Sequence, residues 1–385
     1  MKAPRIKWGM LGGGADSLIG IVHRIAAEMG DDYRLVGGVF SGREAAGKEF
    51  ARDLELDPRR AYQDVDALIA GEMALPPDQR MRLLTIATPN YLHYEAATKL
   101  VGAGFHVLCE KPITTSVAQA MDLARSVQSQ GVIFAVAHTY TGYPMVRQLR
   151  AMVADGMIGA IQKVHVQYYQ GWINPLLRDP AKRRTIWRLD PARGGDSSCI
   201  GDIGVHCFNL VEYTTGLRVE RLLADTDTGA PDNPLDVDGS VLLRLTGNVP
   251  GVLCASQIAT AEENNLQLAV YGRTGALKWA QETPQRLEFL QEGKPLSVLT
   301  AGQPYTAPQA RAASKLPPGH PEGFTDAMGN LYRGVARAIN GEPFDPGAFP
   351  SIDAGVRGMR FIDAVLKSAS SGNQWRDVGL RSLSD

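Results

Sequence analysis

Three residues of this sequence could together move a proton and a hydride: Lys111, Asp202 and His206. Lys111 follows an apolar run that ends at Cys109, so the pattern places a cation at the end of a strand. Asp202 and His206 are four residues apart, and in a helix both side chains would project from one face. A cation can polarise a carbonyl oxygen while an imidazole accepts or returns the proton of the alcohol. These residue types predict interconversion of a carbinol and a carbonyl by hydride transfer.

The elements that precede and surround Lys111 indicate a parallel sheet. Short apolar runs alternate with amphipathic helical patterns over the first 140 residues, which is typical of a sheet covered on both faces. We therefore expect a doubly wound, dinucleotide-binding Rossmann domain over residues 1–140. The predicted strands are Ile6 to Leu11, Leu35 to Phe40, Leu83 to Ala87, His106 to Cys109 and Val132 to Ala137.

Residues 141–385 show a different pattern, which predicts a second α/β domain with an open, mostly antiparallel sheet. The chain as a whole is therefore expected to be an α/β protein. The segment from Thr300 to Gly319 is rich in Pro, Ala and Gln and is predicted to be a long irregular loop. Strand-like runs are Lys163 to Tyr169, Ser240 to Leu245, Val252 to Ile258, Gln267 to Tyr271 and Leu287 to Leu290, and helical patterns cover Met145 to Ala154, Phe324 to Asn340 and Asp353 to Ser368.

A run of glycines, Gly12, Gly13 and Gly14, follows the first predicted strand. Gly12 and Gly14 can take the first two roles of a GxGxxG motif, a tight turn and a close approach of main-chain amides to a pyrophosphate. The third glycine of the motif is displaced by three residues, to Gly20. The alternative is that these are only turn glycines, but their place between a strand and a helix favours a dinucleotide site.

The residues after the second predicted strand bear on the choice of cofactor. An NAD-binding site normally presents Asp or Glu there, whereas this chain has Ser41, Gly42 and Arg43. A hydroxyl and a guanidinium suit a 2′-phosphate, so the prediction is NAD(P)(H) with NADP(H) favoured. The alternative is a helix-capping serine and a surface arginine.

Composition excludes several classes of partner. Lys and Arg number 40 against 41 Asp and Glu in 385 residues, and no block of about five or six like charges occurs, which argues against nucleic acid or membrane partners. No apolar run approaches the roughly 18 to 20 residues of a membrane span. The four cysteines lack CxxC spacing, so we expect no metal site and a cytoplasmic location.

The order and spacing of these motifs resemble the Gfo/Idh/MocA oxidoreductases over nearly the whole chain. The motifs are the glycine turn, Ala87-Thr88-Pro89-Asn90 with His93, Glu110-Lys111-Pro112, and Gly194-Gly195 followed by Asp202, Gly204 and His206. The resemblance implies reversible oxidation of sugars, inositols and related polyols. It also implies a cis Lys-Pro bond and a substrate-binding C-terminal domain whose open sheet joins subunits, giving a homodimer or homotetramer.

The resemblance also assigns roles to single residues. It makes Lys111 the substrate-orienting lysine, His206 the general acid/base and Asp202 the carboxylate that orients substrate or base. The residues expected along the cofactor are Gly12, Gly13, Gly14, Ser41, Arg43, Thr88, Pro89, Asn90, His93, Glu110, Lys111, Trp187 and Arg188. Asn209, where many members have Asp, and the spread glycine turn indicate a divergent branch.

Three further residues are candidate substrate contacts beside Lys111, Asp202 and His206. Tyr140 ends the last Rossmann strand, Trp172 offers an apolar face to a sugar ring, and His320 follows the long loop. The predicted function is an NAD(P)-dependent dehydrogenase or reductase acting on a secondary hydroxyl or ketone of a cyclic polyol, inositol or sugar. Two alternatives remain: an NAD-dependent glycosidase that uses transient oxidation, and a non-catalytic NAD(P)-binding regulator.

Overall fold

The computed structural model describes residues 4–379, which form two compact units. The first unit takes in the chain up to Thr114, Ala118–Thr139 and Phe324–Gly355, and the second takes in the rest. A single boundary after residue 140 does not anticipate that Phe324–Gly355 belongs with the N-terminal part.

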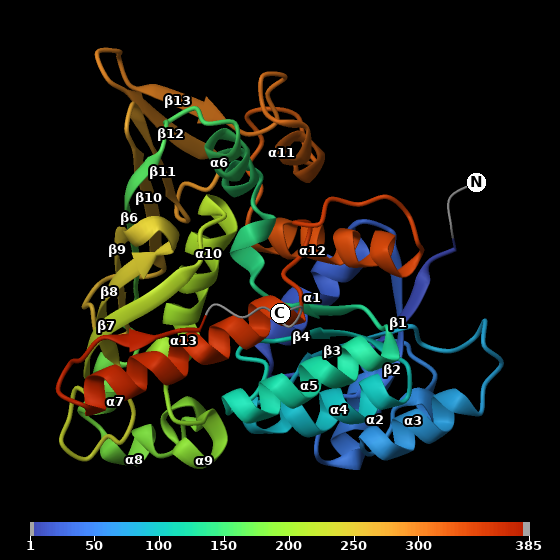
Figure 1. Ribbon diagram of the computed structural model, residues 1–385. Helices are drawn as coiled ribbons and strands as arrows, with labels where there is room; N and C mark the ends of the chain where they lie inside the picture. Colours follow the sequence, from blue (N-terminus) through green and yellow to red (C-terminus); the bar gives the residue numbers. More distant parts are fainter. Residues whose placement is uncertain (1–3, 380–385) are drawn as a thin grey trace. The chain divides into compact units, whose positions relative to one another are not determined.

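The first unit is built on a parallel sheet with the strand order β2-β1-β3-β4-β5 (Figure 1). This sheet confirms the predicted doubly wound Rossmann fold. Gly12 pairs with Ala87, and Ile86 pairs with Cys109, so the carboxyl ends of β1, β3 and β4 lie next to one another. The strand order reverses between β1 and β3, which is where such sheets bind ligands. The strands are β1 Ile6–Gly12, β2 Tyr33–Val39, β3 Leu83–Ala87, β4 His106–Cys109 and β5 Phe134–Val136.

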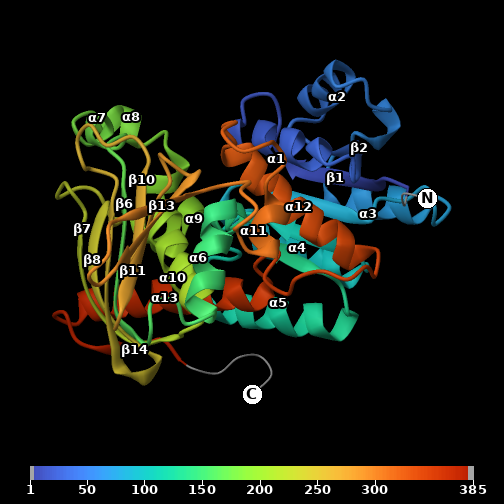
Figure 2. The same ribbon diagram turned by 90° about the horizontal axis from the view of Figure 1, so that it is seen from above.

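Helices cover both faces of this sheet, and α12 (Phe324–Ile339) lies beside α1 (Leu18–Met29) in Figures 1 and 2. Tyr332 explains why α12 belongs to this unit. Its ring packs edge-on against Trp8 and Tyr33, and its carbonyl oxygen accepts from the Tyr33 hydroxyl at 2.9 Å. The other helices are α2 Glu44–Asp53, α3 Val65–Met73, α4 His93–Gly102 and α5 Val117–Gln130.

The second unit contains a nine-stranded sheet with the order β13-β12-β11-β10-β6-β9-β8-β7-β14. All neighbours are antiparallel except β6 and β9, so the predicted open, mostly antiparallel sheet is confirmed. Sequence patterns missed β7, β11, β13 and β14; β14 has only two residues, and the alternation in β7 is broken by a register shift after Val219. The strands are β6 Ile161–Tyr169, β7 Val219–Asp227, β8 Asp238–Leu245, β9 Val249–Ser256, β10 Asn265–Gly272, β11 Gly275–Ala280, β12 Arg286–Gln291, β13 Ser297–Thr300 and β14 Arg376–Asp377.

Helices α6 (Pro144–Ala154) and α10 (Val205–Thr215) lie along one face of this sheet (Figures 1 and 2). The prediction that residues 300–319 form an irregular loop was wrong in part, because this segment contains a helix, α11 (Pro308–Ala313). Pro308 occupies the first turn of α11, where its missing N–H costs nothing, and the Ala307 amide donates to Gln148 Oε1 on α6 at 2.6 Å. The remaining helices are α7 Asn174–Leu177, α8 Pro180–Arg183, α9 Pro191–Gly194 and α13 Ile352–Ser370. Over residues 4–379, no helix combines the length and apolarity needed to cross a bilayer.

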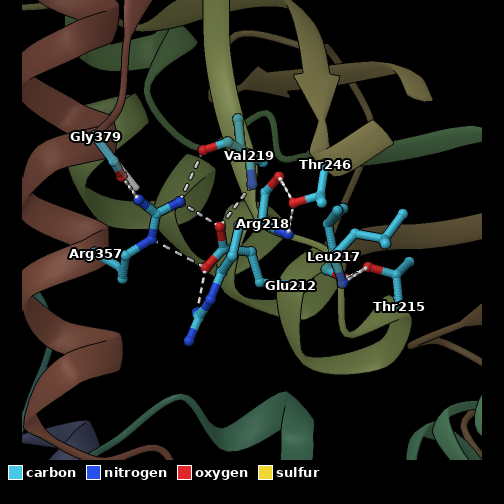
Figure 3. Close-up of polar contacts among 9 residues, drawn as sticks. Glu212, Thr215, Leu217, Arg218, Val219, Thr246, Arg357 and Gly379 are labelled. Atoms are coloured by element: carbon cyan, nitrogen blue, oxygen red, sulfur yellow. Dashed lines mark hydrogen bonds and ion pairs between the residues drawn. The ribbon is translucent and has the colours of Figure 1, made fainter. Parts of the chain in front are cut away.

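A buried ion pair joins α10 to α13 at the end of α10 (Figure 3). Glu212 accepts from the Arg357 guanidinium, from Arg218 Nη1 at 2.8 Å and from the Val219 amide at 2.8 Å. Arg357 also donates to the carbonyl oxygens of Val219 and Gly379. Since every charge here has partners, the pair holds the helix that begins with Val205 against the C-terminal segment.

Candidate active site

The glycine turn of the first unit is closely packed on two sides. Gly12 and Gly13 have φ angles of 77° and 71°, a region that favours glycine. A Cβ on Gly14 would lie 2.5 Å from the carbonyl oxygen of Phe40, at the end of β2. A Cβ on Gly20 would lie 2.4 Å from Gly13 Cα, so Gly20 gives the close helix packing of the third motif glycine despite its displacement.

The residues around this turn fit a dinucleotide. Thr88 follows β3 next to the turn, and its buried Oγ1 has no hydrogen-bond partner among the residues that the structure describes. A Cβ on Gly12 would meet the carbonyl oxygen of Ala87 at 2.5 Å, so only glycine leaves this surface open. α1 is a 12-residue helix capped by Ser17, whose side chain accepts from the Gly20 amide, and the start of such a helix suits a pyrophosphate. An unpartnered hydroxyl beside such a helix start is a binding feature for a phosphate or ribose oxygen.

Ser41 and Arg43 lie just beyond β2, at the edge where an adenosine ribose would be read. Ser41 Oγ accepts from the Arg43 amide at 3.1 Å, and Arg43 is exposed at the position that precedes α2. Arg43 rather than Ser41 therefore occupies the capping position of α2, and it makes no side-chain capping bond. The preference for a 2′-phosphate stays a prediction.

His93 holds two loops of the cofactor side together. It is fully buried, Nδ1 lies 2.8 Å from the carbonyl oxygen of Pro112, and Nε2 lies 2.8 Å from that of Thr88. Burial lowers the pKa of His93. Because both ring nitrogens are directed at main-chain carbonyls, His93 braces these two loops, and its contact with the cofactor stays a prediction.

Lys111 follows β4 and Glu110, and the Lys111–Pro112 peptide bond is cis, as the resemblance implies. Glu110 accepts from the Lys111 amide at 3.2 Å and lies 3.0 Å from Nε2 of His23, which is fully buried on α1. Burial pushes the pKa of Glu110 up, but His23 and the Lys111 cation outweigh it and hold that pKa below its ordinary value. Glu110 is therefore a fixed anion beside Lys111.

A hydrogen-bonded chain connects this anion to the core of the first unit. His23 Nδ1 lies 2.8 Å from the Tyr332 hydroxyl, which lies 2.8 Å from Thr85 Oγ1. No sequence pattern predicts this hydrogen-bonded chain, because its members lie on α1, α12 and β3. They become neighbours only in the folded unit.

The second unit carries Asp202 and His206. The prediction that both lie in one regular helix is corrected by the structure. Asp202 lies in a π-helix, Ile200–Gly204, and His206 lies in the first turn of α10. Asp202 Oδ2 accepts from Gln257 Nε2 at 2.9 Å and lies 3.7 Å from Arg188 Nε. π-Helical turns are rare and frequent at functional sites.

Aromatic and amide side chains surround this pair. Tyr140 packs edge-on against the His206 ring, with centroids 4.9 Å apart, and Tyr168 lies 6.4 Å away. The Tyr140 and Tyr168 hydroxyls are 2.5 Å apart, and Tyr168 donates to Asn264 Oδ1 at 2.6 Å. Burial raises the pKa of Tyr140, so this phenol stays protonated.

The network continues to Trp172. Gln170 donates to Asn264 Oδ1 at 2.9 Å and accepts from Trp172 Nε1 at 3.1 Å. The structure thus brings the predicted Tyr140 and Trp172 into one hydrogen-bonded set near His206. Sequence reasoning missed Tyr168, Gln170 and Gln257, although the alternation of β6 already placed Tyr168 on its buried face.

Two other predicted residues are placed differently. His320 is exposed, with Nδ1 3.1 Å from the carbonyl oxygen of Pro317, and its role as a substrate contact stays a prediction. Trp187 and Arg188 form a short 3₁₀ turn in which the guanidinium lies 4.5 Å from the indole centroid. Since Arg188 also approaches Asp202, this pair belongs to the histidine side, and its cofactor role stays a prediction.

Comparison with known proteins settles the family. Residues 6–138 match the family model described as an oxidoreductase family with an NAD-binding Rossmann fold, and residues 146–278 match the GFO/IDH/MocA C-terminal domain. The chain belongs to the GFO/IDH/MocA oxidoreductases. The predictions of family, fold, enzyme class and a nicotinamide dinucleotide cofactor are therefore confirmed.

Relatives of this GFO/IDH/MocA chain match most of its length. The uncharacterized oxidoreductase YfiI of Bacillus subtilis is 30% identical over 96% of both chains. An inositol dehydrogenase homolog from Azotobacter vinelandii, solved with NAD+, is 32% identical, with a TM-score of 0.91 over 97% of this chain and 98% of its own. A levoglucosan dehydrogenase of Pseudarthrobacter phenanthrenivorans is 25% identical over 78% of this chain and 81% of its own. This chain is thus an NAD-binding oxidoreductase of the sugar or inositol dehydrogenase type.

Proposed function

We propose that this protein transfers hydride between nicotinamide and a secondary hydroxyl, or the corresponding ketone, of a cyclic polyol, inositol or sugar. One observation carries the proposal: the His206 imidazole packs against the ring of Tyr140 and near that of Tyr168. The hydroxyls of these two tyrosines are hydrogen-bonded to each other, and Tyr168 also donates to the Asn264 amide oxygen. Such neutral donors and acceptors suit a substrate made of hydroxyl groups. The relatives support the same class, since one was solved with NADH and myo-inositol and another is a levoglucosan dehydrogenase.

In this proposal each residue of the set has one role. His206 accepts the hydroxyl proton during oxidation and returns it during reduction. Lys111 stabilises the negative charge that develops on the substrate oxygen. Asp202, which Gln257 and Arg188 hold in place, orients the substrate or the base. The bound nicotinamide supplies the hydride acceptor or donor.

The residues of the first unit that would hold the dinucleotide are named by the geometry above. Amides of the glycine turn and the start of α1 would bind the pyrophosphate, and Thr88 Oγ1 would gain the partner it lacks among the described residues. The Glu110 carboxylate, held by His23, can accept from a ribose hydroxyl. The glycosidase alternative is not favoured, because the three relatives described above are an oxidoreductase, an inositol dehydrogenase homolog and a levoglucosan dehydrogenase.

The test is a panel of inositols, aldoses and glycosides, each assayed with NAD and with NADP for appearance of the reduced nicotinamide. The proposal expects stoichiometric reduction of cofactor with at least one free polyol or sugar. Release of an aglycone without net cofactor reduction would contradict it and would instead support transient oxidation.

The exposed face of the nine-stranded sheet supports a proposal about assembly. Leu242, Tyr271 and Val298 project from β8, β10 and β13 on the face opposite α10, and each is more than a third exposed. We propose that this face joins subunits into a homodimer or homotetramer. Sedimentation of the wild type and of Leu242→Asp tests it, because a single monomeric mass for both proteins would contradict it.

The four free cysteines suit a reducing compartment, and we propose a cytoplasmic enzyme.

A further inference from the structure

The π-helix that carries Asp202 begins around a buried residue from another segment, Asp236. One carboxylate oxygen accepts from the Ser198 amide at 3.0 Å and the other accepts from the Ile200 amide at 2.6 Å. The Asp236 carbonyl oxygen accepts from the Cys199 amide between them, also at 3.0 Å. The first amides of a helix lack partners within it, and here one residue satisfies three in a row.

Ser197 completes this arrangement. Its hydroxyl oxygen accepts from the Gly201 amide at 2.9 Å, and the same side chain acts on the Asp236 carboxyl by lowering its pKa. The Asp202 amide then donates to the carbonyl oxygen of Ser198 at 2.7 Å. Each main-chain amide from Ser198 to Asp202 thus has a hydrogen-bond acceptor, and Asp236 provides the acceptors for the first three.

The wide turn that follows depends on where this anchor lies. The Val205 amide donates to the carbonyl oxygen of Ile200, five residues back, which is the hydrogen bond of a π-helix. His206 comes next, at the start of α10. A shift of Ile200 would therefore move both Asp202 and His206.

Keeping a carboxylate at this place is unfavourable in itself. Asp236 is only 5% exposed, and burial raises its pKa although the Ile200 and Ser198 amides donate to it. An asparagine of the same size would have a single acceptor oxygen, and its NH2 group would face one of the amide donors. Only an acid of this length presents two acceptors to the two amides.

We propose that Asp236 is a positioning residue for the dehydrogenase reaction, because it fixes the start of the π-helix and through it the places of Asp202 and His206. This inference rests on the roles proposed above for those two residues. Asp236 itself makes no contact with reacting atoms in this proposal. It acts through the main chain of residues 198–202.

The matched control is Glu212, the other buried carboxylate that serves this helix. It also accepts a main-chain amide, but at the far end of α10, in the ion-pair cluster of Figure 3. Glu212→Gln should lower the melting temperature while kcat per folded molecule stays within about twofold, because the start of α10 keeps its anchor. It separates loss of stability from loss of position.

Asp236→Asn should lower kcat about 10- to 100-fold, the size expected of a misplaced catalytic group, with NAD affinity unchanged. In hydrogen exchange, the amides of residues 198–202 should exchange faster in Asp236→Asn and at the wild-type rate in Glu212→Gln. A kcat within twofold of wild type, or unchanged exchange in this segment, would overturn the inference.

Ser197→Ala gives a milder second variant in case Asp236→Asn does not fold. It keeps the carboxylate but frees the Gly201 amide, and it should lower kcat about three- to tenfold with the same local exchange signature. An unchanged kcat in this variant would also count against the inference. If His206→Asn is fully active, the proposed catalytic roles fail, whereas the exchange result still decides whether Asp236 holds the segment.

Discussion

Lys111 follows a regular parallel strand, whereas Asp202 lies in a π-helix that is held from outside by Asp236. In the first unit, the end of β4 is fixed by its register with β3, and the anion beside Lys111 is held by His23 from α1. In the second unit, the histidine side depends on amide contacts to a segment that is distant in sequence. Lys111 and the residues around His206 should therefore respond to different perturbations.

The main chain at the end of β4 should tolerate substitutions better than the main chain of the π-helical turn. The position of a strand end is set by main-chain hydrogen bonds to the neighbouring strands, so single side chains near it can change without moving the main chain. A π-helical turn has no such ladder and depends on a few polar anchors. Substitutions in the first unit should therefore act through the chemical group that they remove, and substitutions near the π-helix should act through displacement.

The largest effect should come from the lysine itself. Lys111→Ala should lower kcat/KM by about 100-fold, on the order of 3 kcal/mol, because it removes one electrostatic stabiliser of the reacting oxygen. NAD affinity should change far less. Steady-state kinetics with a fluorescence titration of NADH measures both, and Lys99→Ala, a surface lysine in exposed ion pairs, is the control. Near-native turnover would remove Lys111 from the mechanism.

Acid should destabilise the first unit more than the second. The free energy of unfolding of the first unit should fall by up to about 1.4 kcal/mol per pH unit for each buried histidine that must become charged. Burial, together with the nearby Lys111 cation, lowers the pKa of His138 to about 3, and burial lowers the pKa of His93. The unfolded chain binds a proton below its ordinary pKa near 6.5 that the folded chain refuses, so stability falls as pH drops from about 6.5 towards 3. Asp236 changes stability with pH in the opposite direction. Because its pKa is raised in the folded state, the folded second unit takes up a proton there before the unfolded chain does.

Pulse proteolysis at about pH 5 with mass spectrometry of the cut sites measures this difference. Cleavage should begin in the first unit, and His138→Gln should flatten the dependence of its stability on pH. Earlier cleavage in the second unit would show that its anchors, not the buried histidines, limit acid stability.

The glycine turn gives a sharper test of the first unit alone. Gly20→Ala places a methyl group against the main chain of Gly13, so we expect weaker NAD binding by about tenfold, roughly 1.4 kcal/mol. Gly42→Ala is the control, since a Cβ there meets nothing within 4 Å. Calorimetric titration of both variants decides whether Gly20 acts as the third motif glycine; equal affinities would show that it does not.

The smallest effect concerns cofactor choice. Arg43→Ala should shift the ratio of kcat/KM for NADP over NAD towards NAD by up to about tenfold, because a guanidinium pairs with a 2′-phosphate. Ser41→Asp should shift the ratio in the same direction. Arg59→Ala, at an exposed arginine of the same unit, should not. A wild type that already prefers NAD tenfold, with no response to Arg43→Ala, would end this idea.

The sequence predicted the first unit well because its signals are local. The strand patterns, the glycine turn and the position of Lys111 after β4 each depend on neighbours in the chain. The family followed from the order of these motifs. Even Gly20, which looked displaced, is recovered as soon as α1 is packed on the turn.

What the sequence could not predict depends on long-range contacts. Nothing near Asp202 indicates a π-helix, because its register is set by Asp236. Tyr332 joins the N-terminal core from α12, and Asn264 joins Tyr168 from the turn before β10. His93 looked like a cofactor ligand from its motif, but its two carbonyl partners become apparent only when both loops are folded.

The central claim is that His206 is the base, and its most direct test is the pH dependence of kcat/KM for oxidation. A neutral imidazole is needed to accept the proton, so the wild-type rate should rise with pH through a single ionisation, and reduction should favour the protonated form. His206→Asn keeps a hydrogen-bonding side chain of similar volume but cannot exchange a proton in this range. The account predicts that this variant loses most of the rate and the ionisation together, with substrate binding measured separately. A variant that retains the wild-type pH profile would contradict it and assign the base elsewhere.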